Sequence, residues 1–96
     1  MADDEVYRHA AEVVIRRIAG EAILVPIRNR VGDLDSIFTM NETAITIWEA
    51  IDGNTALHDV IDRVCDDYEV DAKTAAADTR EIVMSLIEAG LLEVAK

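Results

Sequence analysis

The chain is poor in cysteine and in long apolar runs, and each shortage excludes a class of protein. A single cysteine, Cys65, in 96 residues excludes an internal disulfide and any CxxC metal or redox motif. No apolar run is long enough to span a membrane, and the charged start MADDE is unlike a signal peptide. These features are typical of a soluble, cytoplasmic protein.

Basic side chains are also scarce. The chain has 20 acidic but only 9 basic residues, a net charge of -11, and such a field repels nucleic-acid phosphates and anionic membranes. The excess is uneven, because residues 41–96 hold 13 acidic and 4 basic side chains. Solubility explains most of this charge. The alternative is that the acids between Asp59 and Asp67 form a docking face for a basic partner.

Motifs for catalysis and cofactor binding are missing as well. The sequence has no Gly-rich phosphate loop, no nucleophile elbow and no HExxH pair. His58 and Asp62 lie four residues apart and could share a metal ion. With Cys65 they still do not supply the four ligands of a closed zinc site. The sequence therefore predicts no metal, no cofactor and no enzymatic activity of the chain alone.

The stretch from Ile37 to Gly53 organises the rest of the pattern. A short β-type run passes without a loop into a helix. Asn41 is placed to cap this helix, because its side-chain oxygen can accept hydrogen bonds from the free amides of the first turn. Trp48 lies mid-helix on an apolar stripe, and Gly53 suits the helix end. We interpret Trp48 as the anchor of the core rather than as a ligand-stacking side chain.

Three strands are predicted up to this helix. Residues 1–11 are interpreted as a flexible, polar lead-in. The β-branched run 13–18 and the apolar run 22–27, with the turn Ala19-Gly20-Glu21 between them, predict a hairpin. A third strand is expected at roughly Asp35 to Met40. Short connections favour an antiparallel meander in the order 1-2-3.

Two more helices are predicted after the Trp48 helix. Apolar residues recur at helical spacing over 57–68. A third helix, capped by Asp71, stops at Gly90. The short apolar tail 91–94 is expected to fold back on the core. The predicted fold class is α+β, three strands and then three helices, in a single domain over 12–96.

The order of these motifs resembles the PqqD-like family, the coenzyme PQQ synthesis protein D superfamily. The segments that carry the resemblance are FTMNETA, IWEAIDG, TALHDVI, DDYEVD and EAGLLE. It extends over roughly residues 12–94, and its most specific positions are Asn41, Trp48, Asp52-Gly53 and the Leu-Leu pair after Gly90. Ala44 departs from the family pattern, where Gly is common. The resemblance implies a winged-helix-like domain.

The same resemblance implies a function. The family recognises the leader segment of a ribosomally made precursor peptide and presents it to a modifying enzyme, in the namesake family a radical S-adenosylmethionine (SAM) enzyme. An extended peptide can add to an open strand edge, so we expect the third strand as docking edge and the third helix as the other wall. The candidate peptide-binding residues are the backbone of Ser36, Ile37, Phe38, Thr39 and Met40, and the side chains of Ala76, Thr79, Arg80, Val83 and Ile87.

Several alternatives stay open at this point. Val83 and Ile87 could equally well be ordinary core residues that do not contact the peptide. Arg80 could pair with a leader carboxylate, although a solvated Arg is the commoner outcome.

Without peptide, the apolar edge predicts a monomer or a dimer formed by edge pairing or hairpin swapping. The alternative function is a winged-helix DNA-binding regulator, which needs a basic recognition helix. An enzyme is the remaining alternative, and no residue set indicates a reaction for it.

Overall fold

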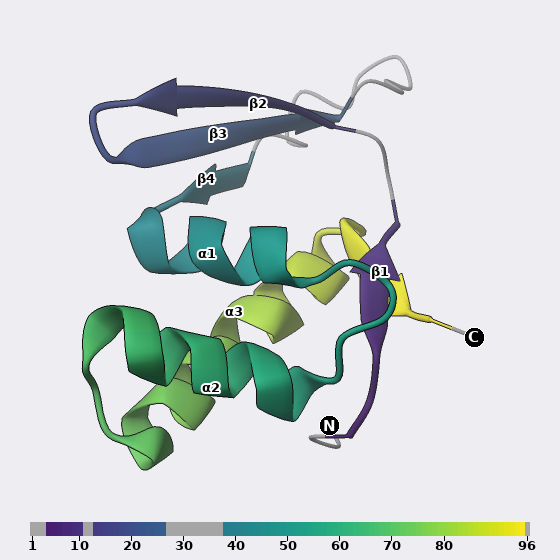
Figure 1. Ribbon diagram of the computed structural model, residues 1–96. Helices are drawn as coiled ribbons and strands as arrows, with labels where there is room; N and C mark the ends of the chain where they lie inside the picture. The colour runs from purple at the N-terminus through teal and green to yellow at the C-terminus, as the bar shows by residue number, and fades with distance from the viewer. Residues whose placement is uncertain (1–3, 11–12, 27–37, 96) are drawn as a thin grey trace.

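Two small sheets and three helices make up the described part of the fold (Figure 1). The structure, a computed structural model, describes residues 4–10, 13–26 and 38–95. The elements in chain order are β1 (Tyr7–His9), β2 (Val13–Ile18), β3 (Glu21–Pro26), β4 (Phe38–Met40), α1 (Glu42–Ala50), α2 (Leu57–Tyr68), α3 (Ala72–Glu88) and β5 (Leu92–Val94). The predicted α+β class, with three meander strands followed by three helices, is confirmed.

The larger sheet is the predicted meander. Its strands lie in the order β2-β3-β4, and both neighbouring pairs are antiparallel. The hairpin turn uses Ala19 and Gly20, which have φ values of 45° and 83°. β4 pairs with β3 so that Thr39 lies opposite Ile23. Of the expected third strand, residues 35–37 lie outside the described residues. Figure 1 shows this sheet as one layer, with α1 next to it and α2 and α3 beyond.

A second sheet corrects the expected lead-in. Within residues 1–11, β1 pairs antiparallel with β5, and Tyr7 lies opposite Val94. The Tyr7 side chain is buried, and this burial, with the nearby Glu5 carboxylate, raises the pKa of its hydroxyl. A three-residue strand is too short to show alternation, so the polar composition around it hid the strand. The predicted return of the apolar tail is confirmed, because Leu92 begins β5 and is buried.

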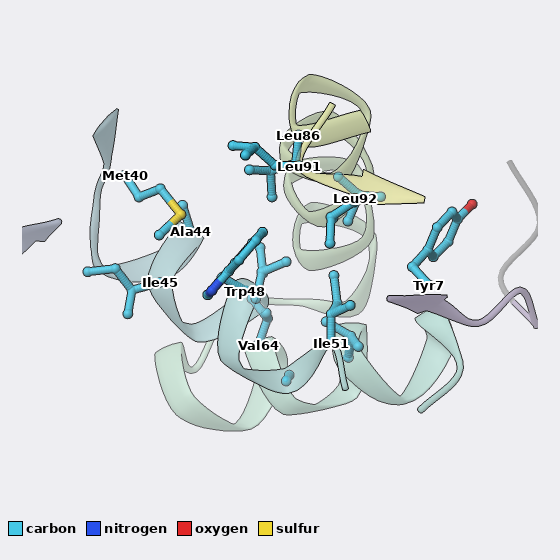
Figure 2. Packing of buried hydrophobic residues seen from close by; sticks show 14 of the residues in the cluster. Tyr7, Met40, Ala44, Ile45, Trp48, Ile51, Val64, Leu86, Leu91 and Leu92 are labelled. Atoms are coloured by element: carbon cyan, nitrogen blue, oxygen red, sulfur yellow. The ribbon is translucent and has the colours of Figure 1, made fainter. Parts of the chain in front are cut away.

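Trp48 is the centre of the core, as predicted. Its side chain is 2% exposed. In Figure 2 it lies between Met40 on one side and Ile51 and Leu92 on the other. The His9 ring stacks on it, with 3.8 Å between ring centroids and 9° between ring planes. The His9 Nε2 atom also lies 2.9 Å from the Trp48 carbonyl oxygen. β1 therefore contacts the core through His9 as well as through Tyr7.

Side-chain caps define two of the helix starts. The Ala44 amide donates to Asn41 Oδ1 at 2.9 Å, and the Thr74 amide donates to Asp71 Oδ1 at 2.7 Å. Both predicted caps are confirmed. The bond from Thr74 favours the charged form of Asp71 and lowers the pKa of its carboxyl group. No helix in the described part of the chain is long and apolar enough to cross a membrane.

The approach to α2 is held by hydrogen bonds to Asp52. Asn54 and Thr55 lie in a turn, and the helix begins at Leu57 without a side-chain cap. In this turn the amides of both Asn54 and Thr55 donate to Asp52 Oδ1 at 2.9 Å. These bonds lower the pKa of the Asp52 carboxyl group. Asp52 therefore connects the end of α1 to the approach to α2.

Candidate functional site

The outer edge of β4 is one of the two edges of the larger sheet, and it is the one that lies beside α3. β4 is the last strand in the order β2-β3-β4, and no strand of the described chain pairs with its other edge. Met40 is buried, Phe38 is half-buried and Thr39 is exposed. This alternation directs Phe38 and Met40 toward the helices and Thr39 away from them. An unpaired edge of this kind presents backbone N–H and C=O groups to an incoming chain.

A groove of about 180 Å³ lies between β4 and α3. Its lining residues are Phe38 and Thr39 of β4, Asn41 and Ala44 at the start of α1, and Glu81, Ile82 and Ser85 of α3. Phe38 and Ile82 are partly buried and pack against the core, so the floor of the groove is apolar. Glu81 is exposed at the rim. The Ser85 hydroxyl donates to the Glu81 carbonyl at 3.1 Å. The groove therefore combines a strand edge, an apolar floor and an acidic rim.

Two further hollows continue the groove around the start of α1. The nearer one, of about 300 Å³, shares Asn41, Glu81 and Ile82 with the groove and adds Thr43 and Asp78. The farther one, of about 660 Å³, reaches the hairpin turn and is lined by Ala19, Gly20, Glu21, Asn41, Glu42, Thr43 and Tyr68. Because neighbouring hollows share lining residues, they lie next to one another, and we call this row of hollows from α3 to the hairpin turn the path.

Tyr68 anchors the far end of this path. Its hydroxyl oxygen lies 2.8 Å from Thr46 Oγ1 and donates to the Glu42 carbonyl at 3.0 Å. These bonds hold the last residue of α2 against the first half of α1. At this end the path is thus bordered by two helices that hydrogen bonds hold together.

The path is acidic. Among the described residues that line the three hollows, the charged ones are Glu21, Glu42, Asp78 and Glu81, and all of them are acidic. A surface that binds nucleic-acid phosphates needs the opposite sign. The electrostatics of this side of the molecule therefore disfavour the DNA-binding alternative.

The structure places the predicted strand residues as follows. Phe38 and Thr39 line the groove, whereas the side chain of Met40 belongs to the core. Ser36 and Ile37 lie outside the described residues. On the strand side, the described part of the predicted segment therefore borders the groove. That its backbone binds a peptide stays a prediction.

The helix side differs from the expected wall. Thr79 and Val83 have no exposed surface and pack in the core. At about 100° per residue, Ala76, Arg80 and Ile87 lie on one flank of this buried stripe. The groove-lining Glu81, Ile82 and Ser85 lie on the other flank. The sequence shows where the stripe of α3 lies, but it does not show which flank faces β4, because that depends on how the helix packs. The sequence pattern indicates that Glu81 and Ser85 face the solvent, so they were not among the predicted wall residues.

The exposed start of α2 brings together His58, Asp59 and Asp62, whose possible ligand atoms lie within 4.8 Å of one another. The His58 Nδ1 atom is 3.1 Å from Asp59 Oδ1. Cys65 is not part of this group. All three side chains are exposed, and exposed acidic groups often gather without a metal ion. We assign no site to this cluster.

Comparisons with known proteins found a matching family model and a solved structure of similar fold. The family model described as coenzyme PQQ synthesis protein D (PqqD) matches residues 21–92, from the start of β3 to the start of β5. The fold is similar to a solved structure of TbiB1 in complex with the TbiA(beta) leader peptide, with a TM-score of 0.70 and 23% sequence identity over 90% of this chain and 94% of that chain. No curated protein gives a significant match. The family match contains both β4 and α3, and therefore both sides of the groove.

Proposed function

The chain belongs to the PqqD family, and from this premise we propose that it recognises the leader segment of a ribosomally made precursor peptide. The observation that carries the proposal is the unpaired edge of β4 beside a groove with an apolar floor. The peptide adds as a strand along β4, so that main-chain hydrogen bonds supply affinity. One apolar side chain of the peptide lies on Phe38 and Ile82. The leader peptide bound to TbiB1 supports a ligand of the same kind.

In this proposal the chain binds and presents the peptide, and a separate enzyme modifies it. By analogy with the namesake family, that enzyme is a radical SAM enzyme. The groove offers backbone groups and an apolar floor, which suit the holding of an extended chain. The proposed location is the cytoplasm, where the precursor is synthesised. Turnover of the precursor by the chain alone, with no partner enzyme and no added cofactor, would contradict this division of roles.

A pair of charge insertions on α3 tests the groove. Ile82 lies on the groove floor, whereas Met84 is 52% exposed on the same helix and does not line the groove. We expect Ile82→Glu to weaken binding of a leader peptide at least about tenfold, because it puts a charge where an apolar side chain is to be buried. Met84→Glu, the matched control, should bind like the wild type.

The measurement is calorimetric titration with the synthetic leader of a precursor peptide encoded next to a radical SAM enzyme. Thermal melts of both variants identify any loss of folding, and Ile82→Ala serves as the milder substitution if Ile82→Glu does not fold. Equal affinities of the wild type, the Ile82 variant and the Met84 variant would place the peptide elsewhere on the molecule.

A further inference from the structure

We infer that the peptide held on β4 carries one or more basic side chains, which lie beside Asp78 and Glu81. The inference rests on the proposed function and states which peptides the groove selects. It concerns the part of the peptide next to its apolar anchor, where the groove opens into the second hollow.

The position of the charges carries this inference. Asp78 and Glu81 lie three residues apart on α3, a spacing that puts both carboxylates on one side of the helix. Both line the second hollow, and both are exposed. The path beyond them adds Glu42 and Glu21. The basic side chains Arg8, Arg17 and Arg63 pair with carboxylates elsewhere and do not line this path. A strand laid along β4 thus enters a surface whose described charged residues are all acidic.

The opposing contribution is small. The start of α1 also borders the path, and a helix N-terminus carries roughly half a positive charge. Four carboxylates outweigh it. The acidic surface therefore favours basic side chains on the peptide. The expected ion pair with Arg80 would instead need an acidic side chain on the peptide, and Arg80 lies on the other flank of α3. Because exposed ion pairs are individually weak, the two α3 carboxylates act mainly by disfavouring acidic peptides and by raising the affinity for basic ones by roughly three- to tenfold.

Selection from a display library of random 12-residue peptides tests the inference without knowledge of the natural ligand. Immobilised wild-type protein should enrich peptides in which Lys and Arg outnumber Asp and Glu next to an apolar residue. The double variant Asp78→Asn/Glu81→Gln should lose this preference. The control variant Asp62→Asn/Asp66→Asn changes the net charge equally on exposed α2 positions outside the groove, and it should retain the preference.

The best enriched peptide then provides a quantitative test. Its affinity should fall roughly three- to tenfold in the Asp78/Glu81 variant and should depend less on salt there than in the wild type. Peptides that shift the β4 amides in NMR spectra but show no excess of basic residues would overturn the inference and leave the proposed function standing. If no enriched peptide shifts the β4 amides, both fail.

Discussion

At the residue scale, Trp48 has the largest predicted effect on stability. Its side chain is 2% exposed and lies at the centre of the core. We expect Trp48→Ala to lower the free energy of unfolding by roughly 3–5 kcal/mol, the range for truncation of a buried aromatic. Urea unfolding measures this value, and Trp48→Phe, which keeps an aromatic ring, should lose less. A melting temperature of Trp48→Ala within a few degrees of the wild type would contradict the packing described above.

Thr79 provides a prediction of opposite sign. Its side chain has no exposed surface, and its hydroxyl has no hydrogen-bond partner among the described residues. A buried hydroxyl without a partner costs about 1–3 kcal/mol, and valine has nearly the same shape. Thr79→Val should therefore raise the unfolding free energy by about 1 kcal/mol.

Chemical denaturation measures this change, and Thr79→Ser is the control, because it keeps the hydroxyl but removes a methyl group. Thr79→Val should leave the binding of a leader peptide unchanged, since Thr79 packs in the core. Weaker binding by a well-folded Thr79→Val protein would return Thr79 to the wall of the groove, where the sequence had placed it.

At the element scale, β1 is the part whose importance the sequence conceals. Removal of residues 1–10 would delete the partner strand of β5 and the ring that stacks on Trp48. It would also uncover Leu92, which is 2% exposed. We expect this truncation to lower the melting temperature by several degrees, because the buried Tyr7 side chain and the pairing between β1 and β5 are both lost.

Calorimetry of the truncated and the complete chain tests this expectation. A truncation of residues 1–3 alone is the control, since it leaves β1 intact. If both truncated proteins melt at the wild-type temperature, β1 contributes little and residues 1–11 behave as the lead-in that the composition indicates.

The elements differ in how well the sequence predicts them, and length is the reason. α2 shows three turns of apolar spacing, so its face toward the core was predicted correctly. β5 follows a clear helix stop at Gly90 and contains Leu92, so its return to the core was also predictable. β1 has three residues and a single buried side chain, Tyr7, and so has no measurable period. The groove flank of α3 depends on packing between distant segments, which no local pattern records.

At the scale of the whole molecule, the open β4 edge predicts self-association. Without peptide, the edge can pair with a second copy of the chain. The net charge of -11 opposes this pairing, so dimers should become more frequent as salt is added. Light scattering over a concentration series at low and at high salt measures the change. A strict monomer at high concentration and high salt would count against an accessible edge.

The central claim is that a leader peptide binds as an added strand along β4, against α3. Amide chemical-shift mapping during titration with the leader peptide tests it most directly. The predicted result is that the largest shifts fall on Phe38, Thr39 and Met40 and on the segment 78–85 of α3. Shifts confined to residues 54–68, with β4 and α3 unchanged, would contradict the claim and would move the binding site to the acidic helix α2.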